Sequence, residues 1–83
     1  MQVRLLFFAT LKDIVGSREM RVEVPHNCTV EDLLNQLEQQ YPQFVAYRSI
    51  LLTAVNEEYV GRSSALAEGD EVAIFPPVSG GSR

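Results

Sequence analysis

Residues 69–81 read Gly-Asp-Glu-Val-Ala-Ile-Phe-Pro-Pro-Val-Ser-Gly-Gly, and this stretch does most to decide the fold. Gly69-Asp70 is a turn signal, and the apolar residues after it predict a strand over residues 71–75. Pro76-Pro77 excludes both helix and central strand, because proline fixes φ and lacks an amide hydrogen. The stretch therefore predicts a last strand that passes directly into an extended tail.

The tail is predicted to be flexible over residues 76–83 and to extend toward another protein instead of packing against its own domain. Residues 76–81, if extended, span roughly 20 Å. Gly80 and Gly81 carry no Cβ atoms, so this part of the chain is thin enough to enter a narrow channel in another protein. The alternative is that these glycines are simply disordered, as the last residues of many domains are.

Composition limits the possible classes of protein. The chain has 83 residues, of which 46% are hydrophobic, which is enough for one small domain. The net charge of −4 shows no basic stripe, so nucleic acid is not an expected partner. No apolar run is long enough to span a membrane, and a single cysteine, Cys28, allows no internal disulfide and no metal site. We expect a cytoplasmic protein that binds neither membrane nor metal.

The first quarter of the chain predicts a strand, a short helix and a second strand. Residues 3–9 form a nearly continuous apolar run, which is typical of a strand covered on both faces or nearly so. Thr10 is predicted to cap a short helix that ends at Gly16. Residues 19–24 alternate between polar and apolar, as in a strand with one face in the core.

The main helix is predicted to follow Thr29. Four apolar residues spaced i, i+3, i+4 and i+7 form one helical face: Val30, Leu33, Leu34 and Leu37. Asp32 stands three residues after Thr29 in an arrangement similar to a capping box, and Tyr41-Pro42 is expected to end the helix.

The remaining segments predict three strands. Residues 50–55 form a second apolar run, a turn follows at residues 56–58, and residues 59–60 form a short return strand before residues 71–75. One long helix on a mixed sheet of about five strands is an α+β roll, and with the double glycine after the last strand it resembles the ubiquitin-like β-grasp. We predict that residues 1–75 form this domain.

Five short segments of the chain together form a recognisable pattern: Leu5-Leu6-Phe7-Phe8-Ala9, Thr29-Val30-Glu31-Asp32-Leu33, Ala54-Val55-Asn56, Gly69-Asp70-Glu71-Val72-Ala73 and Phe75-Pro76-Pro77-Val78-Ser79-Gly80-Gly81. The last segments are the most selective because they combine an acidic turn, a strand, a double proline and a double glycine. In this pattern the chain resembles the small, sulfur-carrying (MoaD-type) subunit of molybdopterin synthase, and the resemblance runs to Gly81.

The resemblance implies a protein cosubstrate of molybdenum cofactor biosynthesis rather than a catalyst acting alone. An adenylating enzyme related to the ubiquitin-activating type would join the terminal carboxylate of Gly81 to AMP using ATP. Sulfur from a persulfide donor would then convert it to a thiocarboxylate. The large synthase subunit would accept the tail and transfer the sulfur to a pterin precursor, in an assembly of two small and two large subunits. The chain itself would bind no cofactor.

Site residues follow from the same resemblance. Gly81 would carry the thiocarboxylate, and the tail residues Pro76, Pro77, Val78, Ser79 and Gly80 would thread into the partner. Phe8, Tyr59 and Phe75 match positions where the family presents apolar side chains on the exposed sheet face, so they are predicted to contact the partner. Phe7 is predicted to lie in the core instead.

Two polar residues are assigned no role. His26 lies in a turn after Pro25 and has no Ser or Cys arrangement with which it could form a catalytic pair. Cys28 has no basic neighbour in the sequence to lower its pKa, so a persulfide role is not expected.

The chain departs from the family at its end, where Ser82-Arg83 follows Gly81. While these residues remain, Gly81 has no free carboxylate. Three explanations are open: a peptidase removes these two residues, they are a cloning remnant, or they begin a longer fused chain. One alternative function is sulfur transfer in another pathway, namely thiamine synthesis, cysteine synthesis or tRNA thiolation. Another is that the chain is a ubiquitin-like modifier or interaction module that carries no sulfur.

Overall fold

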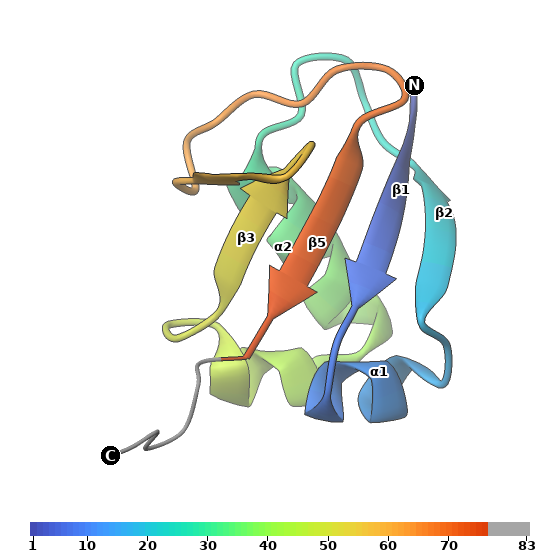
Figure 1. Ribbon diagram of the computed structural model, residues 1–83, viewed down its shortest axis with the longest axis vertical. Helices are drawn as coiled ribbons and strands as arrows, with labels where there is room; N and C mark the ends of the chain where they lie inside the picture. Colours follow the sequence, from blue (N-terminus) through green and yellow to red (C-terminus); the bar gives the residue numbers. More distant parts are fainter. Residues whose placement is uncertain (77–83) are drawn as a thin grey trace.

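The computed structural model describes residues 1–76, which form a five-stranded mixed sheet with one long helix on one face and two short helices at one end (Figure 1). The elements follow the chain as β1 (Gln2–Phe7), α1 (Thr10–Val15), β2 (Glu19–Glu23), α2 (Val30–Gln40), a 3-10 helix η1 (Pro42–Tyr47), β3 (Leu52–Val55), β4 (Glu58–Val60) and β5 (Glu71–Phe75). The predicted α+β roll is confirmed.

The sheet has the strand order β2-β1-β5-β3-β4, with β1 and β5 paired in parallel and all other neighbours antiparallel. The parallel pair requires a long crossover, which includes α2 and brings the chain back across one face of the sheet. Figure 1 shows α2 behind the sheet, while no element of residues 1–76 covers the opposite face. The sheet therefore has one covered face and one open face.

The core lies between α2 and the covered face. Leu33, Leu34 and Leu37 of α2 are buried, as the helical spacing predicted. They pack in one cluster with residues of β1 and β5 such as Phe7 and Ile74. Phe7 is fully buried, which confirms its predicted place in the core.

The start of α2 is fixed by both a capping box and a loop. Thr29 Oγ1 accepts a hydrogen bond from Asp32 N at 3.2 Å, and Asp32 Oδ2 accepts one from Thr29 N at 3.1 Å. The amides of Val30 and Glu31 donate to carbonyls of the β4–β5 loop, at Ser64 and Arg62. Because first-turn amides have no partner inside a helix, these contacts hold the loop after β4 against α2.

Two predictions about local structure were wrong, and one element was missed. The cap of α1 is Ala9, which makes no side-chain capping bond, and Thr10 is already helical. Residues 42–47 form η1, which the sequence did not indicate, and Phe44 within it is fully buried against Phe7 with ring centroids 6.1 Å apart. β1 is covered on one face only, since Gln2 and Arg4 are exposed.

η1 is held to α2 by Arg48. Its Nη1 donates to Glu38 Oε2 at 2.7 Å, and its Nη2 donates to Glu31. The hydrogen bond to Glu38 is the main cause of a raised pKa at Arg48. Arg62 donates in turn to the carbonyl of Arg48, so the ends of α2, η1 and β4 are tied together.

Candidate functional site

The open face of the sheet carries an apolar area at the end where β1 and β5 finish. Phe7 pairs with Ile74 in the parallel register, and both side chains point into the core. Because side chains alternate along a strand, the next residues, Phe8 and Phe75, face the open side. Their rings stack at 4.7 Å between centroids with 14° between planes.

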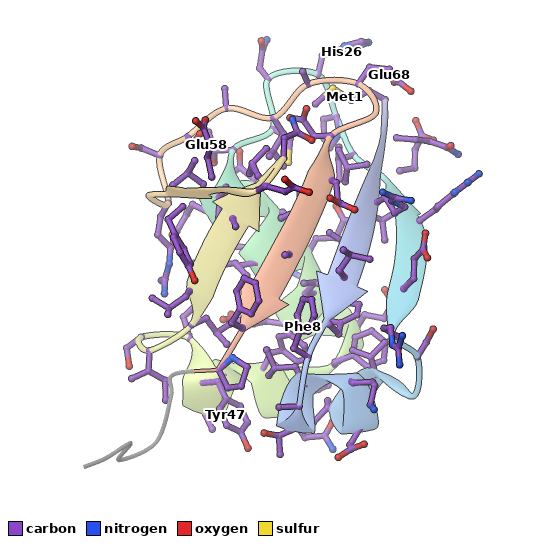
Figure 2. The ribbon with its side chains drawn as sticks, viewed as in Figure 1. Met1, Phe8, His26, Tyr47, Glu58 and Glu68 are labelled. Atoms are coloured by element: carbon purple, nitrogen blue, oxygen red, sulfur yellow. The ribbon has the colours of Figure 1, made fainter. Side chains whose placement is uncertain are left out.

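Tyr59 and Leu52 extend this area across β3 and β4. Tyr59 is 73% exposed, and its ring centroid lies 6.1 Å from that of Phe75. Leu52 pairs with Phe75 and is also exposed. Figure 2 shows the ring of Phe8 on the near side of the sheet, where no ribbon covers it.

We define the docking face as the apolar side chains that point to the open side at this end of the sheet. Its members are Leu6, Phe8, Leu52, Ala54, Tyr59, Ala73 and Phe75. Most of them line a shallow hollow of about 360 Å³ whose rim includes Glu57 and Glu71. An exposed apolar area with a polar rim is a feature of protein interaction surfaces.

The predicted interface residues thus come together. Phe8, Tyr59 and Phe75 arise from three strands and share one surface, although their contact with a partner stays a prediction. Leu52 was missed, because it lies in an apolar run in which the alternation of a one-sided strand cannot be seen. Its pairing with Phe75 is the signal that places it on the docking face.

A strained turn ends β1 beside the docking face. The amide of Leu11 donates to the carbonyl of Phe8 at 3.1 Å, closing a β-turn with Ala9 at φ 54 and ψ −130. This conformation is normally taken by glycine, and non-glycine residues held there cost about 1–3 kcal/mol. The turn ends the strand directly after Phe8.

The other half of the open face is polar. Arg4 on β1 lies between two carboxylates, at 2.5 Å from Glu71 on β5 and 3.5 Å from Glu19 on β2. These ion pairs run across the sheet and mark where the apolar area ends. The open face is therefore divided into an apolar half at the ends of β1 and β5 and a charged half at their beginnings.

The tail begins next to the docking face. Pro76 follows Phe75 directly and is half-buried. The other predicted tail residues, Pro77, Val78, Ser79, Gly80 and Gly81, lie outside the described residues, as do Ser82 and Arg83. Pro76 is the last described residue, and it lies directly beside Phe75 of the docking face.

Neither His26 nor Cys28 belongs to this site. His26 is exposed in the turn after β2, at the end of the molecule away from Phe8 (Figure 2). Cys28 is buried in the core, and its burial, with a smaller effect from Asp32, raises the pKa of its thiol. Within residues 1–76 no cluster of His, Cys, Asp or Glu is placed to hold a metal ion, and no helix could span a membrane.

Comparison with known proteins gives a consistent result. Residues 5–81 match the model of the ThiS family. A molybdopterin synthase sulfur carrier subunit from Chlamydomonas reinhardtii is 39% identical over 98% of this chain and 100% of its own length. A protein of the same name from Homo sapiens is 35% identical over 96% of this chain and 94% of its own length.

Solved structures agree in fold. A putative molybdopterin converting factor, subunit 1, from Pyrococcus furiosus has a TM-score of 0.85 at 29% identity, with 94% of this chain and 99% of that chain covered. Small archaeal modifier protein 1 from H. volcanii has a TM-score of 0.80 at 31% identity, with 93% and 98% covered.

Proposed function

Because the chain belongs to the ThiS family, whose β-grasp fold it shares, we propose that it is the sulfur carrier subunit of a molybdopterin synthase. The observation that carries the proposal is the apolar docking face, which borders the residue where the tail begins. Near full-length similarity to proteins of that name supports it.

In this proposal the docking face and the tail have different roles. Phe8, Tyr59 and Phe75 bind the large subunit, and the binding energy of this surface holds the tail in one orientation. Residues 76–80 then thread into the partner and present Gly81 to the substrate. Positioning a reacting group in this way lowers the entropic part of the barrier.

The chemistry takes place at Gly81 in the form of the chain that ends there, because only without Ser82-Arg83 does Gly81 carry a free carboxylate. An adenylating partner joins this carboxylate to AMP, releasing pyrophosphate from ATP. A persulfide of the sulfur donor then attacks the acyl adenylate, which releases AMP and forms an acyl persulfide. A second thiol of the donor cleaves the S–S bond, leaving the thiocarboxylate on the chain and a disulfide on the donor. The large subunit transfers that sulfur to the pterin precursor, in an assembly of two small and two large subunits. The chain binds no cofactor of its own, and the predicted location of these steps is the cytoplasm.

Intact mass spectrometry tests the proposal. The chain is incubated with its adenylating enzyme, ATP and a persulfide donor, and the mass gain from replacing one oxygen by sulfur is measured. Two matched forms are compared, one ending at Gly81 and one ending at Gly80. Only the first should gain sulfur. Equal loading of both, or of neither, would contradict the assignment of Gly81.

The two shortened forms should fold equally well. Within residues 1–76, every residue of the core cluster lies at or before Ile74, so we expect neither truncation to remove a core contact. Thermal unfolding of both forms checks this expectation. A large loss of stability in the form ending at Gly80 would mean that loss of loading is not a chemical effect.

A ubiquitin-like modifier is the second candidate, favoured by the similarity to small archaeal modifier protein 1. A modifier would be recovered joined through Gly81 to a lysine of another protein. A sulfur carrier would be recovered as the free chain with the sulfur mass. The mass of the protein isolated from its own cells therefore separates the two functions.

A further inference from the structure

The two edge strands of the sheet differ in whether their outward backbone groups are used. The edges are β2 and β4, because the strand order is β2-β1-β5-β3-β4. An edge strand presents unpaired N–H and C=O groups that can pair with another chain unless they are blocked. Which groups face outward follows from the alternation of hydrogen-bonded pairs in an antiparallel ladder.

On the β2 edge the outward residues are Glu19, Arg21 and Glu23. The amide of Phe7 donates to the carbonyl of Arg18 at 2.8 Å, so Arg18 is a residue whose backbone groups bond toward β1. Because bonding and non-bonding residues alternate, every second residue of β2 counted from Arg18 also bonds toward β1. The intervening residues direct their backbone groups away from the sheet.

Side chains occupy three of the six outward backbone groups on this edge. Ser17 Oγ donates to the carbonyl of Glu19 at 2.7 Å and accepts from its amide at 3.3 Å. Gln36 of α2 donates to the carbonyl of Glu23 at 3.2 Å. Arg21 lies between these positions, so a strand that pairs with it would meet an occupied carbonyl on either side, at Glu19 and Glu23.

On the β4 edge the outward residue is Tyr59. The amide of Asn56 donates to the carbonyl of Glu71 at 2.8 Å, so Asn56 and every second residue before it, Ala54 and Leu52, direct their backbone groups toward β5. Thr53 and Val55 must then bond toward β4, with Val60 and Glu58 as their partners in the register. Tyr59, opposite Ala54, directs both its N–H and its C=O away from the sheet.

No side chain of residues 1–76 blocks this position. No hydrogen bond joins the backbone of Tyr59 to any loop, cap or side chain in the described part of the protein. An apolar hollow of about 410 Å³ lies beside it, lined by Leu51, Leu52, Thr53, Tyr59, Val60, Gly61 and Arg62. The β4 edge thus offers both backbone groups and space for an apolar side chain.

We propose that the β4 edge pairs with an extended segment of the large subunit, which places an apolar side chain in this hollow. This inference rests on the proposed function, because the large subunit is the protein that the docking face is proposed to bind. Tyr59 and Leu52 belong to both surfaces, so a partner on the docking face reaches the β4 edge without a gap.

The chemistry of the edge describes the segment that fits. It is extended, because only an extended chain directs its backbone groups at Tyr59 and an alternate side chain into the hollow. Glu57 and Glu58 lie at the turn beside the edge and are exposed, so a basic residue at that end of the segment would be favourable. The pairing is short, and the aromatic rings of the docking face remain the main anchors.

Amide hydrogen exchange measured by NMR tests the pairing. The exchange rate of the Tyr59 amide is compared in the free chain and in the complex with the large subunit, and the Arg21 amide on the β2 edge is the internal control. We expect Tyr59 to exchange at least about tenfold more slowly in the complex, and Arg21 to be unchanged.

The outcomes separate the two proposals. A complex in which Tyr59 exchanges as fast as in the free chain would overturn the pairing and leave the proposed function standing. Protection of Arg21 equal to that of Tyr59 would also overturn it, since the effect would not be specific to the β4 edge. If no complex forms, both proposals fail.

Two substitutions separate the backbone from the side chain. Tyr59→Ala removes the ring and keeps the amide, whereas Tyr59→Pro removes both. Because this amide does not bond to β3, proline at this edge position leaves the ladder intact. We expect the complex of Y59P to be about threefold to tenfold weaker than that of Y59A. Equal affinities would overturn the pairing.

A folding control accompanies this comparison. Arg21→Pro places proline at the corresponding outward position of the β2 edge, and its affinity should match that of Arg21→Ala. If Y59P does not fold, the exchange measurement on the unsubstituted chain still decides the question.

Discussion

The two faces of the sheet are both rich in apolar residues, but only one is closed. Phe7 and Phe8 are neighbours in the chain, yet Phe7 is fully buried under α2 and η1, whereas Phe8 is 37% exposed beside Phe75. On the covered face apolar contacts stabilise the domain. On the open face similar residues contribute less to stability and remain available to a partner.

The largest expected difference between the faces is in stability. Phe7→Ala should lower the free energy of unfolding by about 3–5 kcal/mol, because it leaves a cavity next to Phe44. Phe8→Ala should cost only about 1 kcal/mol, because its ring is already partly hydrated. Urea unfolding of both variants measures the difference. Equal losses would mean that Phe8 is a core residue.

Cys28 tests whether the covered side is closed to reagents. It is buried and part of the core cluster, so a thiol reagent should label the folded protein on the order of 100-fold more slowly than the unfolded chain. Mass spectrometry over a time course measures both rates, with urea-unfolded protein as the control. Rapid labelling of the native protein would show that the core opens readily.

The raised pKa of Cys28 also has a consequence for stability. The folded state keeps the thiol protonated at pH values where the unfolded chain has begun to ionise. The contribution of the Cys28 thiol to the free energy of unfolding is therefore complete below the pKa that the thiol has in the unfolded chain. It is lost as the pH rises through the higher pKa that the thiol has in the folded state. A Cys28→Ala variant should lack this alkaline loss.

Phe75→Ala tests the open face in the same way. We expect the dissociation constant for the large subunit to rise about tenfold or more, since truncation of a central aromatic residue in an interface typically has that effect. Val45→Ala is the matched control, because Val45 is an exposed apolar residue outside the docking face. A large loss of stability with unchanged binding would place Phe75 in the core.

The contrast between the faces also explains which structural predictions from the sequence succeeded. β5 was predicted with its observed bounds, Glu71–Phe75, because a turn and a proline end it on either side. α2 was predicted from its capping box and its apolar spacing, which are local signals. Both elements are defined by residues within one short window.

The errors come from residues whose environment is set by distant parts of the chain. β1 reads as an apolar run because Leu6 and Phe8, on the open face, are as hydrophobic as its core residues. The run therefore predicts two covered faces, whereas one of them is the docking face. η1 was missed because it is stabilised by packing of Phe44 on Phe7 and by the bonds from Arg48 to α2, none of which is visible locally.

The candidate site was predictable only in part. The resemblance indicated Phe8, Tyr59 and Phe75, but their stacking depends on the register of three strands. The open backbone of Tyr59 could not be predicted, because it depends on which residues of β3 bond toward β5. Edge properties of a sheet follow from topology, which short sequence patterns do not determine.

The smallest expected effect concerns the boundary of the docking face. Arg4→Gln removes the ion pairs with Glu71 and Glu19 in the charged half of the open face, where the side chain of Arg4 is 43% exposed. Such pairs contribute little, so we expect a stability loss below about 0.5 kcal/mol that shrinks as salt is added. The dissociation constant for the large subunit should change by less than about twofold, because the side chain of Arg4 is not among those lining the apolar hollow.

Calorimetric titration of the Arg4→Gln variant against the large subunit, at low and high salt, measures this change. An unchanged affinity would confine the interface to the apolar half of the open face, where the tail begins. A tenfold loss at low salt that disappears at high salt would instead mean that the charged half also contacts the partner. The interface would then extend across the whole open face, and its specificity would rest on charge as well as on the aromatic residues.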